Sequence, residues 1–185
     1  AEEAGISEGV IYRHFESKQG LLVETAIAGY DIQESYRSAA LERASSSPIA
    51  RLMAIGHAYI HFARAYPGYF LLMKSMETEE ILSSPRYQEQ RTETLRVMRS
   101  LIYDCIAAGL FVDMDTDLAM AALQATAFGI AQLYMADQLR YVAPSLVDDE
   151  NLVAHLLQVN VGNLLSAKDR RQIARACLDP FTEQN

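Results

Sequence analysis

Apolar side chains recur every three or four residues through most of this chain, and short breaks rich in serine, proline or glycine separate these stretches. This spacing is typical of amphipathic helices, and no alternating run of β-branched and polar residues suggests a strand. The pattern therefore predicts an all-α fold. We expect helices over 18–44, 48–66, about 69–76, 85–108, 117–141 and 151–166, with a shorter amphipathic one ending near residue 178.

The expected helix at 117–141 is unusual because no charged residue occurs between Leu118 and Ala136. A membrane span is the alternative, but the stretch is rich in alanine and contains Gln124 and Gln132, whereas a span needs about 20 strongly apolar residues. We favour a helix covered on two sides and no membrane partner. A single small domain cannot cover both sides, so we predict a homodimer through this helix and the one at 151–166.

Composition describes a globular chain of 185 residues, with 24 acidic and 16 basic side chains and a net charge of −8. This balance does not favour general polyanion binding, although local charge can differ. Two cysteines lie 72 positions apart in helical patterns, which favours buried thiols and a cytoplasmic location. The chain opens inside a helical pattern and without methionine, so we expect a fragment that lacks N-terminal residues.

The opening stretch SEGVIYRHFESK, residues 7–18, is polar and aromatic. Gly5 is suited to end a preceding helix, and Ser7 to cap the next one. That next helix has only about seven residues, too few to be stable alone, so it must pack through Ile11 and Phe15. A short helix that packs on one face and presents polar and aromatic groups on the other, beside a tight turn, is typical of a helix-turn-helix recognition element.

Residues 1–22, AEEAGISEGVIYRHFESKQGLL, resemble the second half of the DNA-binding domain of TetR-family transcriptional regulators. The resemblance rests on Ala4-Gly5-Ile6-Ser7, on Tyr12-x-His14-Phe15, and on Ser17-Lys18 followed by Leu21-Leu22. Two further segments agree with the family: Gly109-Leu110-Phe111, and the pattern of Phe62, Pro67, Phe70 and Met73, which looks like one class of its C-terminal domains.

The resemblance implies a partial helix-turn-helix DNA-binding domain with a connecting helix at 1–45, whose first helix is missing. A helical-bundle ligand-binding and dimerisation domain would occupy 46–185. The implied protein is a cytoplasmic, homodimeric regulator that binds a double-stranded operator and responds to a small-molecule effector. It would be a repressor released from a palindromic operator by an apolar or aromatic compound.

The resemblance also assigns DNA contacts within the opening stretch. It places Ser7, Glu8, Gly9 and Arg13 against base edges, and Tyr12, His14 and Lys18 against phosphates. Residues 7–18 are neutral overall, so phosphate contacts would be shared with the missing residues.

A second group of residues, rich in aromatic rings, suggests a cavity for an apolar ligand rather than plain core. The residues that we expect to bind ligand are Tyr59, Phe62, Tyr66, Phe70, Met73, Tyr103, Gln124 and Phe128.

Metal and enzyme chemistry find little support. His57 and His61 share a helix face, but no third ligand stands at helical spacing beside them, so we expect no metal and no cofactor. Phosphate-loop, metalloprotease, di-iron and redox motifs are absent. The protein is therefore not expected to be an enzyme; the alternative is a dimeric all-helical small-molecule-binding protein, or an enzyme, without a DNA role.

Overall fold

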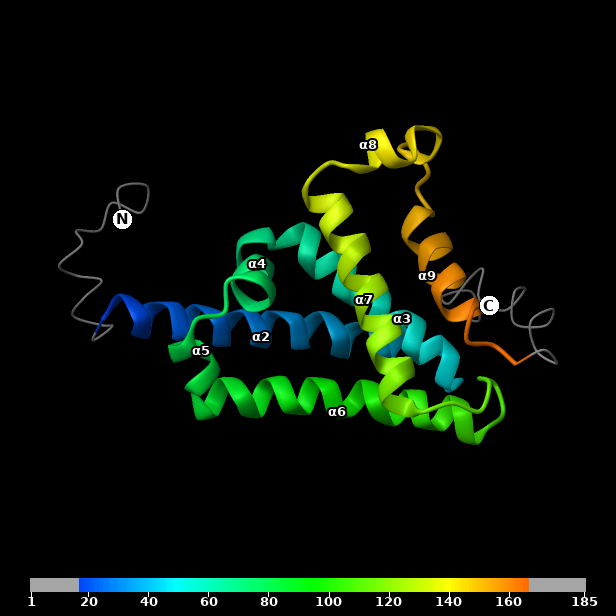
Figure 1. Ribbon diagram of the computed structural model, residues 1–185, viewed down its shortest axis with the longest axis horizontal. Helices are drawn as coiled ribbons and strands as arrows, with labels where there is room; N and C mark the ends of the chain where they lie inside the picture. Colours follow the sequence, from blue (N-terminus) through cyan, green and yellow to red (C-terminus); the bar gives the residue numbers. More distant parts are fainter. Residues whose placement is uncertain (1–16, 167–185) are drawn as a thin grey trace.

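The computed structural model describes residues 17–166, and the predicted all-α fold is confirmed (Figure 1). The β-structure in this range is one isolated antiparallel bridge, between Phe111 and Leu165. The helices are α2 (Lys18–Arg43), α3 (Pro48–Ala65), α4 (Pro67–Ser75), α5 (Glu79–Ser83), α6 (Pro85–Ala107), α7 (Thr116–Met135), α8 (Leu139–Val142), the 3-10 turn η1 (Pro144–Leu146) and α9 (Leu152–Gly162).

Local capping explains why the helices begin where the sequence indicates. The Ser17 hydroxyl accepts a hydrogen bond from the Gly20 N–H at 3.0 Å, and an Asp115 oxygen accepts one from the Leu118 N–H at 2.9 Å. Prolines stand at the first position of α3, α4 and α6, where no N–H is needed. The predicted starts at residues 18, 48 and 85 are confirmed.

The predicted ends are less accurate in the C-terminal half. A helix from 117 to 141 was expected, but α7 stops at Met135, and Asp137 adopts a positive φ of 52°. Aspartate tolerates this left-handed conformation, so the chain turns there without glycine or proline to announce it. Likewise α9 ends at Gly162 rather than Ser166, because the following residues pair with the Leu110–Val112 segment.

Helix α3 lies at the centre and packs against α2, α4, α6, α7 and α9. Helices α2 and α6 run side by side along the length of the molecule, and α7 and α9 lie together (Figure 1). Fully buried Phe62, Phe70, Ile102 and Phe111 belong to the hydrophobic core that joins these helices. The core thus forms around α3, and every long helix contributes to it.

Helix α7 is, by length and hydropathy alone, the one helix between residues 17 and 166 that could cross a membrane. It packs against α3, α6 and α9 through a buried face that includes Leu123, Ala127 and Ile130. The opposite face is exposed, with Leu118 at 61%. A single chain therefore covers one side of α7, as expected from the sequence, and coverage of the other side by a second copy stays a prediction.

Candidate functional site

A cavity of about 220 Å³ lies among α2, α3, α4, α6, α7 and α9. Part of its wall is apolar, with Leu52 and Met53 on α3, Met98 on α6 and Leu123 on α7. Another part is polar and charged. It comprises Tyr30, Gln33 and Arg37 on α2, Lys74 on α4, Glu77 just beyond α4, and Arg91 and Thr94 on α6.

Lys74 differs from the other charged residues of this wall in its partners. Its ammonium donates a hydrogen bond to the Tyr30 hydroxyl at 3.2 Å and lies 4.7 Å from the centre of the Tyr30 ring. Within residues 17–166, no carboxylate lies at ion-pair distance from it. Burial lowers the pKa of Lys74 to about 8, with Glu77 opposing the change and Arg91 adding to it. Most of the ammonium groups therefore remain protonated at pH 7.

The other two cations of the wall already have carboxylate partners. Arg37 is buried and forms an ion pair with Glu34, and it also donates to the Thr94 carbonyl at 3.5 Å. Arg91 lies 3.5 Å from a Glu77 carboxylate oxygen. The two arginines are thus largely compensated, whereas Lys74 is not.

Glu77 has a second partner in the buried Tyr87. The Tyr87 hydroxyl donates its single proton to the Glu77 carboxylate, and the Met73 carbonyl lies 3.2 Å from the same hydroxyl oxygen as a weaker, competing acceptor. Burial and the bond to Glu77 raise the pKa of Tyr87, so it stays a donor at neutral pH. This network holds the Glu77 carboxylate on Arg91 and Tyr87, so that it stabilises the Lys74 charge only through space and forms no ion pair with it.

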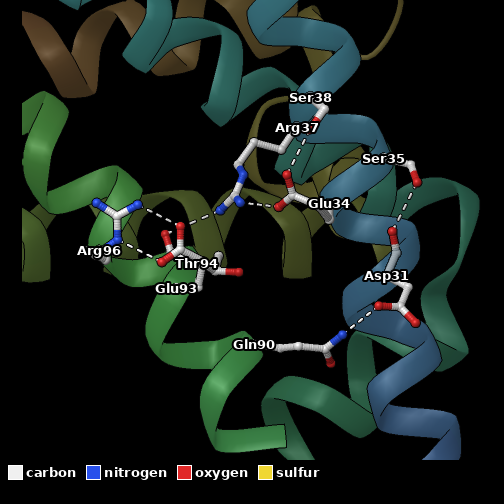
Figure 2. Close-up of polar contacts among 9 residues, drawn as sticks. All are labelled: Asp31, Glu34, Ser35, Arg37, Ser38, Gln90, Glu93, Thr94 and Arg96. Carbon is white, nitrogen blue, oxygen red and sulfur yellow. Dashed lines mark hydrogen bonds and ion pairs between the residues drawn. The ribbon is translucent and has the colours of Figure 1, made fainter. Parts of the chain in front are cut away.

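Figure 2 shows how Arg37 reaches from α2 toward α6. Beside it, Gln90 on α6 donates to Asp31 on α2 at 2.5 Å, while Glu93 pairs with Arg96 at 2.7 Å within α6. Most of these groups are exposed, and such contacts typically contribute less than about 1 kcal/mol each. The seam between α2 and α6 next to the cavity is therefore polar and weakly held compared with the apolar core.

A second polar pair lies on the α3–α7 side of the cavity. The Gln124 amide donates to the Tyr59 hydroxyl at 3.2 Å, and burial raises the pKa of Tyr59. Both side chains line the cavity. They form a neutral polar part of the wall, on different helices from most of its charged residues.

The structure brings together three of the eight residues expected to bind ligand: Tyr59, Met73 and Gln124 line the cavity. Phe62 and Phe70 are fully buried in the core, and Phe70 stacks against Phe128 with ring centres 6.0 Å apart. None of these three lines the cavity. Tyr66 and Tyr103 are 38% and 61% exposed and also lie off the wall. Ligand contact by any of the eight stays a prediction.

Sequence reasoning missed the charged wall. Lys74 could have been noticed as the one cation in the apolar segment PGYFLLMKS, residues 67–75. Gln33 and Arg37 stand one helical turn apart on α2 and are both buried, but nothing local distinguishes them from solvated polar residues. Their meeting with Lys74 depends on how α2, α4 and α6 pack together.

The possible histidine pair has no third potential metal ligand grouped with it among the residues that the structure describes. His57 is half-buried with its Nε2 unpaired, and His61 is exposed. Burial and then His61 lower the pKa of His57, which keeps it neutral at pH 7. Between residues 17 and 166, no cluster of three potential metal ligands occurs.

The residues expected to contact DNA fall almost entirely outside the described range. Lys18 is described, and it is the exposed first residue of α2. Those that lie outside residues 17–166 are Ser7, Glu8, Gly9, Tyr12, Arg13 and His14.

Comparison with protein families identifies the architecture that carries this cavity. Residues 52–159 match the family described as tetracyclin repressor-like, C-terminal domain, and residues 1–25 match bacterial regulatory proteins, tetR family. The first match covers more than half of the chain. The chain belongs to the TetR family. It is accordingly a DNA-binding transcriptional regulator and not an enzyme, which removes the alternative without a DNA role.

Solved structures share the fold of this TetR-family chain. A protein of unknown function from Rhodococcus sp. RHA1 has a TM-score of 0.69 at 24% identity, over 90% of this chain and 82% of that one. A bacterial regulatory protein in the tetR family from Rhodococcus RHA1 has a TM-score of 0.66 at 18% identity, over 90% of this chain and 84% of that one. The TetR-family transcriptional regulator PfmR from Thermus thermophilus has a TM-score of 0.58 at 22% identity, over 71% of this chain and 72% of that one. No curated protein matches the sequence.

Proposed function

We propose that this TetR-family regulator is a cytoplasmic repressor, released from a palindromic operator when a small molecule occupies the cavity. The position of α2 carries the proposal. Residues 18–25 of this helix belong to the segment that matches the family's N-terminal region, and Tyr30, Gln33 and Arg37 of the same helix line the cavity. An occupant of the cavity therefore touches the helix that leads directly to the DNA-binding domain.

The operator would be read by two copies of residues 7–18. Ser7, Glu8, Gly9 and Arg13 would face base edges, and Tyr12, His14 and Lys18 would bind phosphates, as the family resemblance implies. Symmetry of the protein requires a palindromic site whose halves lie about 34–36 Å apart on one face of the duplex.

The exposed faces of α7 and α9 support a homodimer as the working form. Leu118 is 61% exposed and Val159 is 66% exposed, and Ala122 and Ala125 lie exposed on the same helix as Leu118. Large apolar residues exposed together on two adjacent helices are typical of an interface. Small residues on α7 allow a second copy to approach closely.

The energetic requirement for release is modest. An effector needs only to bind the released conformation more tightly than the DNA-bound one, and coupling free energies of about 1–3 kcal/mol are typical. The polar seam between α2 and α6 suits such a change, because exposed ion pairs and hydrogen bonds exchange partners at little net cost.

A gel-shift experiment on the full-length protein with DNA from upstream of its own gene tests this function. We expect binding as a dimer and release by an effector. Replacing Ala127, which lines the cavity, by leucine should weaken the effector response while operator binding persists. Ala107→Leu, at an exposed position of α6, is the matched control. Failure to bind any upstream fragment, or an unchanged response of Ala127→Leu, contradicts the proposal.

A further inference from the structure

The cavity has an imbalance of charge that a bound molecule would correct. Three cations line it, Arg37, Lys74 and Arg91, and one carboxylate, Glu77. Arg37 is paired with Glu34 from outside the wall, and Arg91 is paired with Glu77. One positive charge, that of Lys74, is left without a counterion among the residues that the structure describes.

An ammonium in this position is costly without a partner. Its contacts with Tyr30, a hydroxyl oxygen and a ring face, are favourable but supply no full negative charge. A buried or half-buried charge is stabilised chiefly by a charged partner with which it forms hydrogen bonds. The lysine has three N–H donors, and its bond to the Tyr30 hydroxyl uses one of them.

A second polar group of the wall also lacks a partner. The side-chain oxygen of Gln33, one turn from Tyr30 on α2, is buried and accepts no hydrogen bond. Buried polar atoms in folded proteins are nearly always satisfied. The Lys74 ammonium is thus the donor of the charged wall that lacks a full partner, whereas the Gln33 oxygen is an acceptor, which a carboxylate does not satisfy, and it says nothing about the sign of the ligand's charge.

From the Lys74 ammonium and the apolar wall we infer that the cavity binds a small monocarboxylic acid, whose carboxylate pairs with that ammonium and whose body lies on the apolar wall. This inference rests on the proposed function for its regulatory meaning, but it concerns the ligand's chemistry. A cationic ligand is excluded by the surplus of positive charge. A neutral one would strip water from Lys74 and leave it unpaired. A phosphate monoester carries about two charges, whereas one unpaired cation is available.

The volume sets the size of the acid. A cavity of about 150 Å³ holds benzene, which has six carbon atoms. This ratio corresponds to about 25 Å³ of cavity volume for each non-hydrogen atom of the ligand. The 220 Å³ observed thus suits roughly nine non-hydrogen atoms. Benzoate and hexanoate are of this size, and their primary amides have the same shape without the charge.

The test measures binding of these four compounds to the full-length protein by calorimetry at pH 7. We expect each acid to bind at least about tenfold more tightly than its amide, which is the difference typical of a charge-assisted hydrogen bond. Lys74→Met should remove this preference, and Arg43→Met, an exposed cation at the end of α2, should keep it. Circular dichroism checks that both variants are folded.

The outcomes separate this inference from the function on which it rests. Equal affinity for acid and amide, or no binding of either acid at millimolar concentration, overturns the inference. These measurements use the wild-type protein, so they decide the question even if Lys74→Met does not fold. Retention of the acid preference in folded Lys74→Met overturns the role of Lys74. Acids that bind with this preference but never release DNA support the inference and contradict the proposed repression. Release of DNA by the amides and not by the acids supports the proposed repression and contradicts the inference about a carboxylate ligand.

Discussion

Gly29 on α2 lies directly against the Met73 side chain on α4. A Cβ atom placed on Gly29 would overlap the Met73 sulfur and would lie 3.2 Å from Cδ1 of Tyr69. Met73 is fully buried and also lines the cavity, so the cavity is open space into which its side chain can move. The close approach of α2 and α4 thus depends on the absence of a side chain at position 29.

Gly29→Ala should therefore push Met73 into the cavity. Overpacking a core costs about 1–3 kcal/mol, while alanine in a helix interior is favoured over glycine by about 1 kcal/mol, so we expect a net loss of about 0–2 kcal/mol. Denaturant unfolding measures the loss, and the methyl resonance of Met73 should shift. Gly68→Ala, on α4 where a Cβ meets nothing within 4 Å, is the control; it should cause no loss of stability and leave the Met73 resonance in place. An unmoved Met73 resonance in Gly29→Ala would refute the contact.

The lowered pKa of Lys74 predicts a pH-dependent stability. Tyr30, Glu77, Tyr87 and Arg91 surround the group. Its pKa is about 8 in the folded chain and 10.5 in the unfolded chain. Between these values the unfolded state binds more protons, so this group makes the folded state more stable as pH rises, by at most about 1.4 kcal/mol per pH unit.

Comparison with Lys74→Met isolates this effect, because tyrosines and Cys105 also titrate in alkali and affect both proteins alike. The variant lacks the uncompensated ammonium, so we expect it to be the more stable protein at pH 7. Its advantage should shrink between pH 8 and pH 10, measured by urea unfolding. A constant difference over this range would show that the lysine pKa is not lowered.

The exposed apolar faces of α7 and α9 predict that charge will separate the dimer. Leu118→Glu and Val159→Glu place a carboxylate on positions 61% and 66% exposed in the single chain. We expect either variant to shift the protein toward monomer in analytical ultracentrifugation with its helix content intact. Met76→Glu, at a position 63% exposed beyond α4, should stay dimeric. Equal behaviour of all three variants would place the interface elsewhere.

The two cations of the family motif predict separable effects on DNA. Arg13→Ala should relax the preference at one operator position and cost about 1–3 kcal/mol there, because arginine pairs with guanine in bidentate fashion. Lys18→Ala should weaken all sequences alike and lower the salt dependence by about one unit. Binding titrations over a panel of operator variants distinguish the two. Indistinguishable profiles would contradict both roles.

The sequence predicts the helices well where a local signal marks their ends. Ser17, Pro48 and Pro85 act on the neighbouring backbone, so the starts of α2, α3 and α6 are readable without a structure. The end of α7 is not readable, because the turn at Asp137 replaces a helix that the apolar pattern would allow to continue. Helix periodicity reports which face is buried but not which partner covers it.

The candidate site, like the helices, is predicted by the sequence only in part. Aromatic and thioether composition indicates a cavity, and Tyr59, Met73 and Gln124 do line one. The same composition cannot separate lining from core, which is why Phe62 and Phe70 were expected in a cavity and lie beside it. The surplus of positive charge around Lys74 involves residues of α2, α4 and α6, which are far apart in sequence. It arises only when these helices pack together, so the sequence alone does not reveal it.

Helix α2 runs without interruption from Lys18 to Arg43. At 1.5 Å per residue, Lys18 stands about 18 Å along the axis from Tyr30, which contacts the Lys74 ammonium. A tilt of about 10° pivoting at Tyr30 would sweep the start of the helix through about 3 Å, and the symmetric copy would double that separation to about 6 Å. In the proposed dimer, the stiffness of α2 would thus amplify an adjustment at the cavity wall that is too small to disturb the core. The resulting displacement of the DNA-binding ends would be comparable to nearly two base-pair steps of the duplex.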